Sequence, residues 1–572
     1  MTACQVDQRV NTAIDLPSQQ TAPPRRRFLK RCIGSVAALT CSDFLSYFAA
    51  YGMPAESKSE RMAADATEAS EDPHFLIYWY LEGGWCGYDM FNPVNTENNV
   101  VHRLDEISQE RYRVLPWGND DYHIKTRGNI RYGYLAEPGS ELFSDMAVLS
   151  SMHTGSGHSR DRLKVHMGDY SFKQTEPRED DERSVMQAFS EVYGQPYVLP
   201  HLSWHWWLSD GELNETQYTG RRGYYHALGP VHAHTVYAGT PKKLRSLLLQ
   251  LHESSGDAVN AQVDKFLSDA HQEILNDDNI QAVRSYHSAR DIYLQLNQKG
   301  KNLDRTALVN LFSDPILRED FGVTAADELI TYRSVNGNKA RSKFSPNTNV
   351  QAMMALELLA QGLSCGFFIE SRDVRRFDSH NSRKNLWRGK GNQPVGNPDQ
   401  SEMMKQDLWT PLTTLVRHLK NTEYKNSETS LFDHTNIVIT SEFGRSIHGD
   451  VQGILEKKIS EEKKQAEIGG QDISAHWQVT SCAFLGGNVK GDSQYGRVGE
   501  ATLMAIPILP DGSLDPAYNP ITGQLNPEQA KSPHSFIPNH GDVYATALEL
   551  SGVSPAGRGR NERPALPFIK RS

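Results

Sequence analysis

Short runs of apolar residues recur along the chain and predict strands that are buried on both faces of a sheet. These runs are rich in β-branched and aromatic side chains, and turn-forming residues bound them. They comprise residues 75–81, 147–151, 365–370 and 436–440.

Apolar residues at helical spacing predict amphipathic helices at residues 351–362, 407–420 and 540–550. A rhythm in which helices alternate with strands is typical of a parallel sheet with helical crossovers. The sequence therefore predicts an α/β fold with a largely parallel sheet.

The most informative of these strands, at residues 436–440, ends in the segment Ser-Glu-Phe-Gly-Arg at residues 441–445. Ligands of open α/β sheets bind beyond the carboxyl ends of the strands. Glu442 and Arg445 are therefore candidates for a functional site. Spacing alone favours equally an ion pair between Glu442 and Arg445 that closes a loop.

Other polar residues follow the remaining strands. Asp89 lies in a glycine-rich segment after the first strand and could instead cap a helix. After the second strand, hydroxyl groups at Thr154, Ser156 and Ser159 are candidate nucleophiles, although a capped loop has the same composition.

Residues of types that commonly bind metals follow the predicted strands at 365–370 and 436–440. Asp378 and His380 are two residues apart, so on extended backbone both side chains can reach one metal ion. His476 is the last imidazole that we expect near the same site.

The chain has 572 residues, which is too long for one small core. We expect a main domain at residues 75–555 with an insertion at about 170–345. The part at 170–240 is rich in Tyr, Trp and His and predicts surface packing or stacking on a planar ligand. Residues 241–300 have helical periodicity, and residues 505–535 predict a long surface loop.

The N-terminal segment resembles a twin-arginine export signal. Arg25 to Lys30 read Arg-Arg-Arg-Phe-Leu-Lys and precede a moderately apolar run that is too short to span a membrane. We therefore expect a signal and the start of a linker at residues 1–60, a linker at 61–74, and a tail at 556–572. The expected location is the periplasm or the exterior, and the export machinery is an expected partner.

Composition narrows the classes of partner and of cysteine site that we expect. The formal net charge is −10, and there is no basic stripe or finger spacing, so we expect no nucleic-acid partner. After the predicted signal, the chain keeps Cys86, Cys365 and Cys482, which form neither a disulfide framework nor a zinc-binding pair. Cys365 and Cys482 lie in apolar runs and are predicted to be core residues.

Together these segments resemble the bacterial family called domain of unknown function 1501, whose members carry twin-arginine signals. This family is regarded as a distant relative of the alkaline phosphatase and sulfatase superfamily. The resemblance is discontinuous over residues 75–555. Its most specific match is Ser441 to Arg445, and further matches lie at Gly83-Gly84 with Asp89, at 151–154, at 377–380 and at 486–491.

The resemblance implies an alkaline-phosphatase-like sandwich with helices on both faces of the sheet and one or two divalent metals at one edge. It implies that Asp378 and His380 form a metal pair, with the other ligands at Asp89, Glu442 and His476. The metal could be Zn, Mn, Ca or Mg. The nucleophile would be Thr154, Ser156 or Ser159, and Arg445 would steady the anionic group.

The sequence also departs from the superfamily pattern, because Phe443 stands where a histidine is usual and Tyr544 where a histidine is expected. We therefore expect either a metal-dependent hydrolase that acts on a phosphate or sulfate ester, with an anionic small-molecule or glycan ester as its substrate, or a binding or assembly protein of the cell envelope on a degenerate hydrolase fold. A third expectation is transfer of a phosphoryl or other group to an envelope polymer.

Overall fold

The structure is a computed structural model, and its larger compact unit spans Met53–Ser572. All described residues belong to this unit. They are residues 74–94, 124–155, 157–168, 184–204, 235–237, 240–254, 299–300, 302–328, 346–371, 377, 400, 403–425, 427–445, 460, 476–556 and 563–571.

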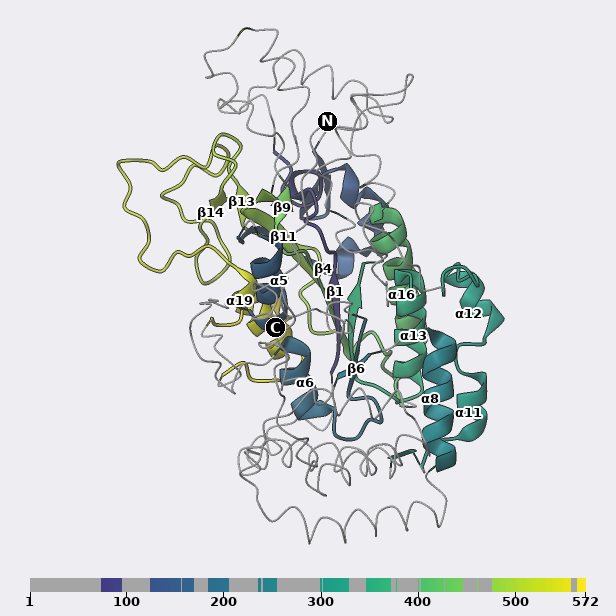
Figure 1. Cartoon of the computed structure of the whole chain (residues 1–572). Helices are drawn as coiled ribbons and strands as arrows, with labels where there is room; N and C mark the ends of the chain where they lie inside the picture. Colours follow the sequence, from purple (N-terminus) through teal and green to yellow (C-terminus); the bar gives the residue numbers. More distant parts are fainter. Residues whose placement is uncertain are drawn as a thin grey trace, which may run out of the picture. The chain divides into compact units, whose positions relative to one another are not determined.

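A mixed sheet of eight strands forms the centre of the described unit (Figure 1). The strand order is β12-β4-β11-β8-β1-β7-β5-β6. The bounds are β1 Phe75–Tyr80, β4 Met146–His153, β5 His201–Ser203, β6 Thr235–Tyr237, β7 Gly366–Glu370, β8 Thr435–Thr440, β11 Val479–Gly486 and β12 Ser493–Tyr495.

Strand β1 lies between β7 and β8 and is parallel to both, with Tyr80 opposite Glu370 on one side and Thr440 on the other. Strand β11 is antiparallel to its neighbours β4 and β8, whereas the other pairings are parallel. The other seven strands therefore point in one direction. The predicted α/β class with a largely parallel sheet is confirmed at this level.

The apolar runs form strands because both faces of each strand are buried. Every residue of β1, β7, β8 and β11 is buried, so both faces of the central strands are covered. The strands predicted at 75–81, 147–151, 365–370 and 436–440 are confirmed. Cys365 and Cys482 are buried with free thiols, as expected for core residues.

Two groups of helices pack against the sheet (Figure 1). Helices α5 (His158–Met167), α6 (Val185–Tyr193) and α19 (His540–Leu550) pack on one another, and α19 also contacts β8. Helix α13 (Thr348–Ala360) packs on α16 (Thr410–Asn421), on the π-helical turn η8 (Lys405–Trp409) and on β7. The helices predicted at 351–362, 407–420 and 540–550 are thus present.

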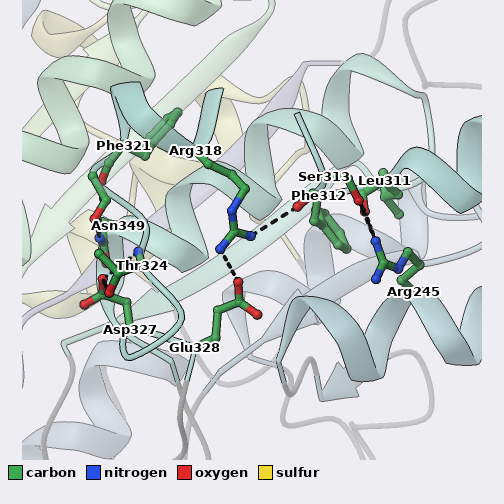
Figure 2. A network of polar contacts seen from close by, with 11 residues as sticks. Arg245, Leu311, Phe312, Ser313, Arg318, Phe321, Thr324, Asp327, Glu328 and Asn349 are labelled. Atoms are coloured by element: carbon green, nitrogen blue, oxygen red, sulfur yellow. Dashed lines mark hydrogen bonds and ion pairs between the residues drawn. The ribbon is translucent and has the colours of Figure 1, made fainter. Parts of the chain in front are cut away.

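We call four helices the helical lobe, namely α8 (Pro241–Ser254), α11 (Arg305–Asn310), α12 (Pro315–Asp320) and α13. Figure 2 shows the polar contacts that hold its loops together. Arg245 donates to the carbonyl of Leu311 and to the hydroxyl of Ser313, and Arg318 binds the carbonyl of Phe312 and the carboxylate of Glu328. The helical periodicity at 241–300 is confirmed in α8; residues 255–298 lie outside the described residues.

The region predicted as an insertion also contributes to the main sheet, because β5 pairs with β7 and β6 pairs with β5. His201 and Trp204, which we expected in surface packing, are buried there. Residues 507–539 form the predicted long loop without a helix or strand. Residues 563–571 bind the same unit, since Tyr495 donates to the carbonyl of Phe568 over 2.7 Å.

Short elements complete the described chain. The two-stranded sheets pair β9 (Gly444–Arg445) with β10 (His476–Trp477), β13 (Arg497–Val498) with β14 (Ala505–Ile506), and β2 (Lys125–Arg127) with β3 (Ile130–Tyr132). The 3-10 helices are η1 (Gly87–Asp89), η4 (Tyr134–Asp145) and η9 (Pro567–Ile569).

Candidate functional site

Four strands that run in one direction release polar residues at the same edge of the sheet, which we call the carboxyl edge. Glu82 follows β1, and Glu370 ends β7. Thr154 follows β4, and Glu442 follows β8. Because parallel strands bring their carboxyl ends together, residues far apart in the sequence meet there.

Glu442 is completely buried and accepts hydrogen bonds from several donors. The amide of Gly83 lies 2.9 Å from Oε1, and the hydroxyl of Tyr80 lies 3.0 Å from Oε2. The hydroxyl of Ser441 donates to Oε2 over 3.2 Å. Donors directed at a carboxylate favour its charged form, so the environment of Glu442 is suited to a buried anion.

Arg445 binds the backbone carbonyls of the Gly83-Gly84 loop, whose Gly83 amide binds Glu442. Its Nε donates to the carbonyl of Gly83 over 3.0 Å, and its guanidinium also lies 5.4 Å from the ring of Phe443. Gly84 has a φ of +82°, and a side chain there would meet the Phe443 ring at 2.5 Å. Glu442 and Arg445 therefore both fix the Gly83-Gly84 loop, which is a positioning role.

A buried ion pair lies beside this loop. Arg162 of α5 binds the carboxylate of Glu82, and both side chains are at most 1% exposed. Helix α5 thereby supplies a charge that balances an acid at the end of β1. Leaving either charge buried without the other would be strongly unfavourable.

Tyr80 connects the acids around it. Burial is the main cause that raises its pKa well above 10, and the neighbouring carboxylate of Glu442 raises the pKa further. Arg162 lowers this pKa, whereas Glu82 and Glu370 raise it. The hydroxyl of Tyr80 therefore stays protonated and remains a donor to Glu442.

Two imidazoles come from helices. The capping box of Asn539 and Asp542 fixes the start of α19, and the ring of His540 lies 3.1 Å from the backbone carbonyl of Glu442. Burial lowers the pKa of His540 to about 4, so the ring is neutral near pH 7. The ring of His166 stacks on Phe368, with 4.4 Å between the ring centroids.

We define the carboxyl-edge cluster as the buried residues that are connected through Tyr80 and Glu442. It comprises Tyr80, Glu82, Arg162, His166, Glu370, Glu442 and His540. The carboxyl groups of the cluster outnumber its guanidinium.

Thr154 lies at the same edge, and its hydroxyl donates to the carbonyl of Gly155 over 3.1 Å. The amides of Gly155 and Gly157, which precede α5, donate to the carboxylate of Asp161 over 3.0 and 2.8 Å. Asp161 in the first turn of α5 therefore fixes the loop that precedes the helix. Ser156 lies outside the described residues, and the side chain of Ser159 is not described.

Asp89 and His476 occupy neighbouring elements. Asp89 lies in η1 and accepts a long hydrogen bond of 3.4 Å from the hydroxyl of Tyr134. His476 lies opposite Arg445 in the β9–β10 pair, and its ring centroid is 4.2 Å from that of Phe443. The structure thus brings His476 next to the Ser441–Arg445 segment.

The predicted metal pair, Asp378 and His380, lies outside the described residues. The residue before it, Phe377, is described and buried, and its amide donates to the carbonyl of Glu82 over 2.9 Å. Gln400 joins the same place, since it donates to the carbonyl of Phe377 and accepts from the amide of Cys86. The chain that leads to Asp378 is therefore bound at the carboxyl edge.

Among the described residues, no group of three or more His, Cys, Asp or Glu side chains has the arrangement of a metal site. Because Asp378 and His380 are not among them, the predicted ligand set stays a prediction. In the part of the chain that the structure describes, no helix has the length and apolar character needed to cross a membrane.

Sequence reasoning missed six members of the cluster, since it predicted only Glu442 as a site residue and treated Tyr80 as part of a buried strand. Glu82 and Glu370 could have been found by the rule that singled out Glu442, since each is an acid at the end of a buried strand. Arg162, His166 and His540 lie on helices, and no local pattern indicates that they face this edge.

The fold and the cluster define an α/β protein whose buried polar residues gather at the carboxyl edge of a mostly parallel sheet. No known family model matches the sequence, and no curated protein matches it significantly. The resemblance to the domain of unknown function 1501 family stays a prediction.

Proposed function

We propose that this protein is an exported, metal-dependent hydrolase that cleaves a phosphate or sulfate ester at the carboxyl edge of an alkaline-phosphatase-like sheet. The single observation that carries the proposal is that segments following β1, β7 and β8 meet at the Gly83-Gly84 loop. Phe377 binds Glu82 next to that loop, and Glu442 binds the amide of Gly83.

The residue types at this edge suit a divalent cation. Carboxylates and imidazoles are ligands that Zn and Mn accept, and Ca and Mg favour carboxylates. Asp378 and His380 would hold the ion with His476, Glu442 and Asp89 as further ligands. When bound, such an ion polarises the ester and lowers the pKa of a nucleophile.

The chain's own residues would prepare the site for that chemistry. Thr154 or Ser156 would supply the attacking hydroxyl at the end of β4. Glu442 and Arg445 would hold the Gly83-Gly84 loop in place, and Tyr80 would keep Glu442 oriented through its hydrogen bond.

Metal content tests the proposal directly. Purified mature protein should contain about one or more equivalents of tightly bound Zn, Mn, Ca or Mg and should hydrolyse members of a panel of aryl phosphate and sulfate esters. Asp378→Ala and His380→Ala should each lower the bound metal. The surface pair Asp320 and His418, whose side chains lie 2.8 Å apart in the helical lobe and on α16, provides matched control substitutions. Unchanged metal in both Asp378 and His380 variants would refute the assignment.

A second candidate is a non-catalytic binding or assembly protein of the cell envelope. The complete burial of Glu442 and Arg445, and their shared contacts with one loop, favour it, because these groups are then structural. Metal-free protein that stays folded and shows no thermal shift with added metals would support this candidate over the hydrolase.

A further inference from the structure

Two arginines share one carboxylate oxygen away from the carboxyl-edge cluster. Arg131 of β3 lies 2.9 Å from Oε1 of Glu500, and Arg497 of β13 lies 3.2 Å from the same atom. The Glu500 side chain is 3% exposed, whereas those of Arg131 and Arg497 are 25% and 30% exposed. The carboxylate is therefore inside, and the two guanidiniums reach solvent.

The charges of this group are not balanced within it. Two guanidiniums, which stay protonated in proteins, face one carboxylate. Burial lowers the pKa of Arg131, and the nearby charge of Arg497 lowers the pKa further, so the two cations repel each other. In addition, Nε of Arg497 is buried and has no hydrogen-bond partner among the described residues.

The backbone around Arg131 is held rigidly by one amide side chain. Oε1 of Gln494 accepts from the amide of Arg131 over 2.7 Å, and Nε2 donates to the carbonyls of Arg131 and Phe91 and to the hydroxyl of Ser150. A guanidinium on a fixed backbone loses less entropy when it binds a ligand.

Near Phe91, whose carbonyl binds Gln494, lie buried polar atoms that have no hydrogen-bond partner among the described residues. Asn92 follows Phe91 and is 3% exposed, yet neither its Nδ2 nor its Oδ1 has a hydrogen-bond partner in the described part of the chain. Oγ1 of Thr480 is also buried and has no hydrogen-bond partner among the described residues. Both residues border Gly87, where a Cβ atom would lie 3.2 Å from Nδ2 of Asn92 and 3.8 Å from Cα of Thr480. Such orphaned groups are costly unless another molecule supplies partners.

The arginine pair is connected to the elements of the proposed active site. Leu503, in the β13–β14 connection, accepts hydrogen bonds from Tyr88 of η1 and from Trp477 of β10. Asp89 follows Tyr88, and His476 precedes Trp477. Arg497 therefore belongs to a hairpin that borders both segments, and Glu500 links it to Arg131 of β3.

We propose that Arg131 and Arg497 form an oxyanion site that binds a sulfate or phosphate group. Guanidiniums recognise such groups through parallel N–H donors. The further consequence, that the group belongs to a substrate with a second anionic substituent, rests on the proposed function. The binding step itself does not depend on it.

Titration of inorganic sulfate, followed by thermal shift and by calorimetry, tests the site in the full-length mature protein. We expect Arg131→Gln and Arg497→Gln each to weaken sulfate binding about 10- to 100-fold, because each removes a charge-assisted hydrogen bond. Arg305→Gln is the matched control, since Arg305 is an exposed arginine of α11 whose side chain also pairs with one glutamate. It should leave sulfate binding unchanged.

A purely structural role for Glu500 would give a different result. In that case the Arg131 and Arg497 variants would unfold at lower temperature but gain as much stability from sulfate as the wild type, and the proposal would fail. Glu500→Gln separates the two readings further, because removal of the competing charge should tighten sulfate binding. Weaker or equal binding in a folded Glu500→Gln protein would also count against the site.

Comparison of esters with one and two anionic groups tests the substrate consequence. An Arg497→Gln variant should raise KM for the ester with two anionic groups by a larger factor than KM for the simpler ester, whereas Arg305→Gln should change neither. Sulfate binding without any ester hydrolysis would uphold the oxyanion site and reject the hydrolase, so the two proposals can fail separately.

Discussion

Glu442 at the sheet edge is completely buried and Glu357 in the helical lobe is half-buried, and the two acids also differ in their hydrogen-bond donors. Glu442 accepts from Gly83, Tyr80 and Ser441. Glu357 accepts from the amide of Phe312 over 2.7 Å, and its Oε1 has no hydrogen-bond partner among the described residues. Burial raises the pKa of Glu357 to about 7, despite this amide and the lowering effects of Arg318 and Arg245. The comparison teaches that even partial burial raises the pKa of a carboxyl group when few donors face it.

The ion pairs of the sheet edge and of the helical lobe differ in their burial. The Glu82–Arg162 pair at the sheet edge is buried, whereas the side chains of the Glu253–Arg305 pair in the helical lobe are 59% and 62% exposed. Each buried charge depends on its partner, because water cannot replace it. The exposed pair is solvated in either state and contributes little.

The largest expected effect comes from breaking the buried pair. Arg162→Met should destabilise the protein by about 3–5 kcal/mol, because the carboxylate of Glu82 would stay buried without its partner. Urea unfolding measures the change, and Arg305→Met is the matched control with an expected effect below about 1 kcal/mol. Similar losses in the two variants would remove the distinction between the regions.

The next effect concerns His540. Its pKa is about 4 in the folded protein and about 6.5 when unfolded, so the unfolded state takes up a proton first as the pH falls. Stability should therefore be lost between about pH 6.5 and 4, by up to about 3 kcal/mol. Unfolding of chelator-treated protein across this range should show a flatter pH profile for His540→Gln than for wild type. If the substitution leaves the pH profile unchanged, His540 takes up its proton equally well in the folded protein, and the prediction is wrong.

A third test compares two glycines with positive φ. Gly84→Ala places a Cβ atom 2.5 Å from the Phe443 ring at φ +82°, whereas Gly322→Ala in the helical lobe meets nothing within 4 Å at φ +60°. Both should cost about 1–2 kcal/mol in backbone strain, and Gly84→Ala about 1–3 kcal/mol more from the steric clash. Thermal unfolding checks the difference, and equal losses would show that the Gly83-Gly84 loop can yield.

The smallest expected effect is at Glu357, where stability depends on pH in the opposite direction to that at His540. Because the pKa of Glu357 is about 7 when folded and about 4.5 when unfolded, stability should fall as the pH rises through this window. Allowing for solvent screening of this partly exposed group, we expect about 1–2 kcal/mol. Glu357→Gln keeps an acceptor for Phe312 and should remove this loss in unfolding experiments at pH 5–8. The exposed Glu319→Gln on α12 is the control, and an equal change in both variants would argue against a special environment at Glu357.

The local sequence was sufficient to predict the central strands and the acid that follows β8. Runs of apolar residues report that both faces of a segment are buried, whatever its neighbours are. That reasoning located β1, β4, β7 and β8 and drew attention to Glu442. The same reasoning predicted α19, since its helical periodicity is also a local property.

Only the tertiary structure decided which residues meet. Tyr80 and Glu442 are 362 positions apart, and no local pattern states that β1 lies between β7 and β8. For the same reason, sequence alone left the contacts of Glu442 and Arg445 open, whereas the structure directs both to the Gly83-Gly84 loop. Periodicity reveals which side of a segment is buried, but strand order and helix packing choose its partners. Those long-range choices placed Arg162 and His540 beside the acids and joined Arg131 to Arg497 through Glu500.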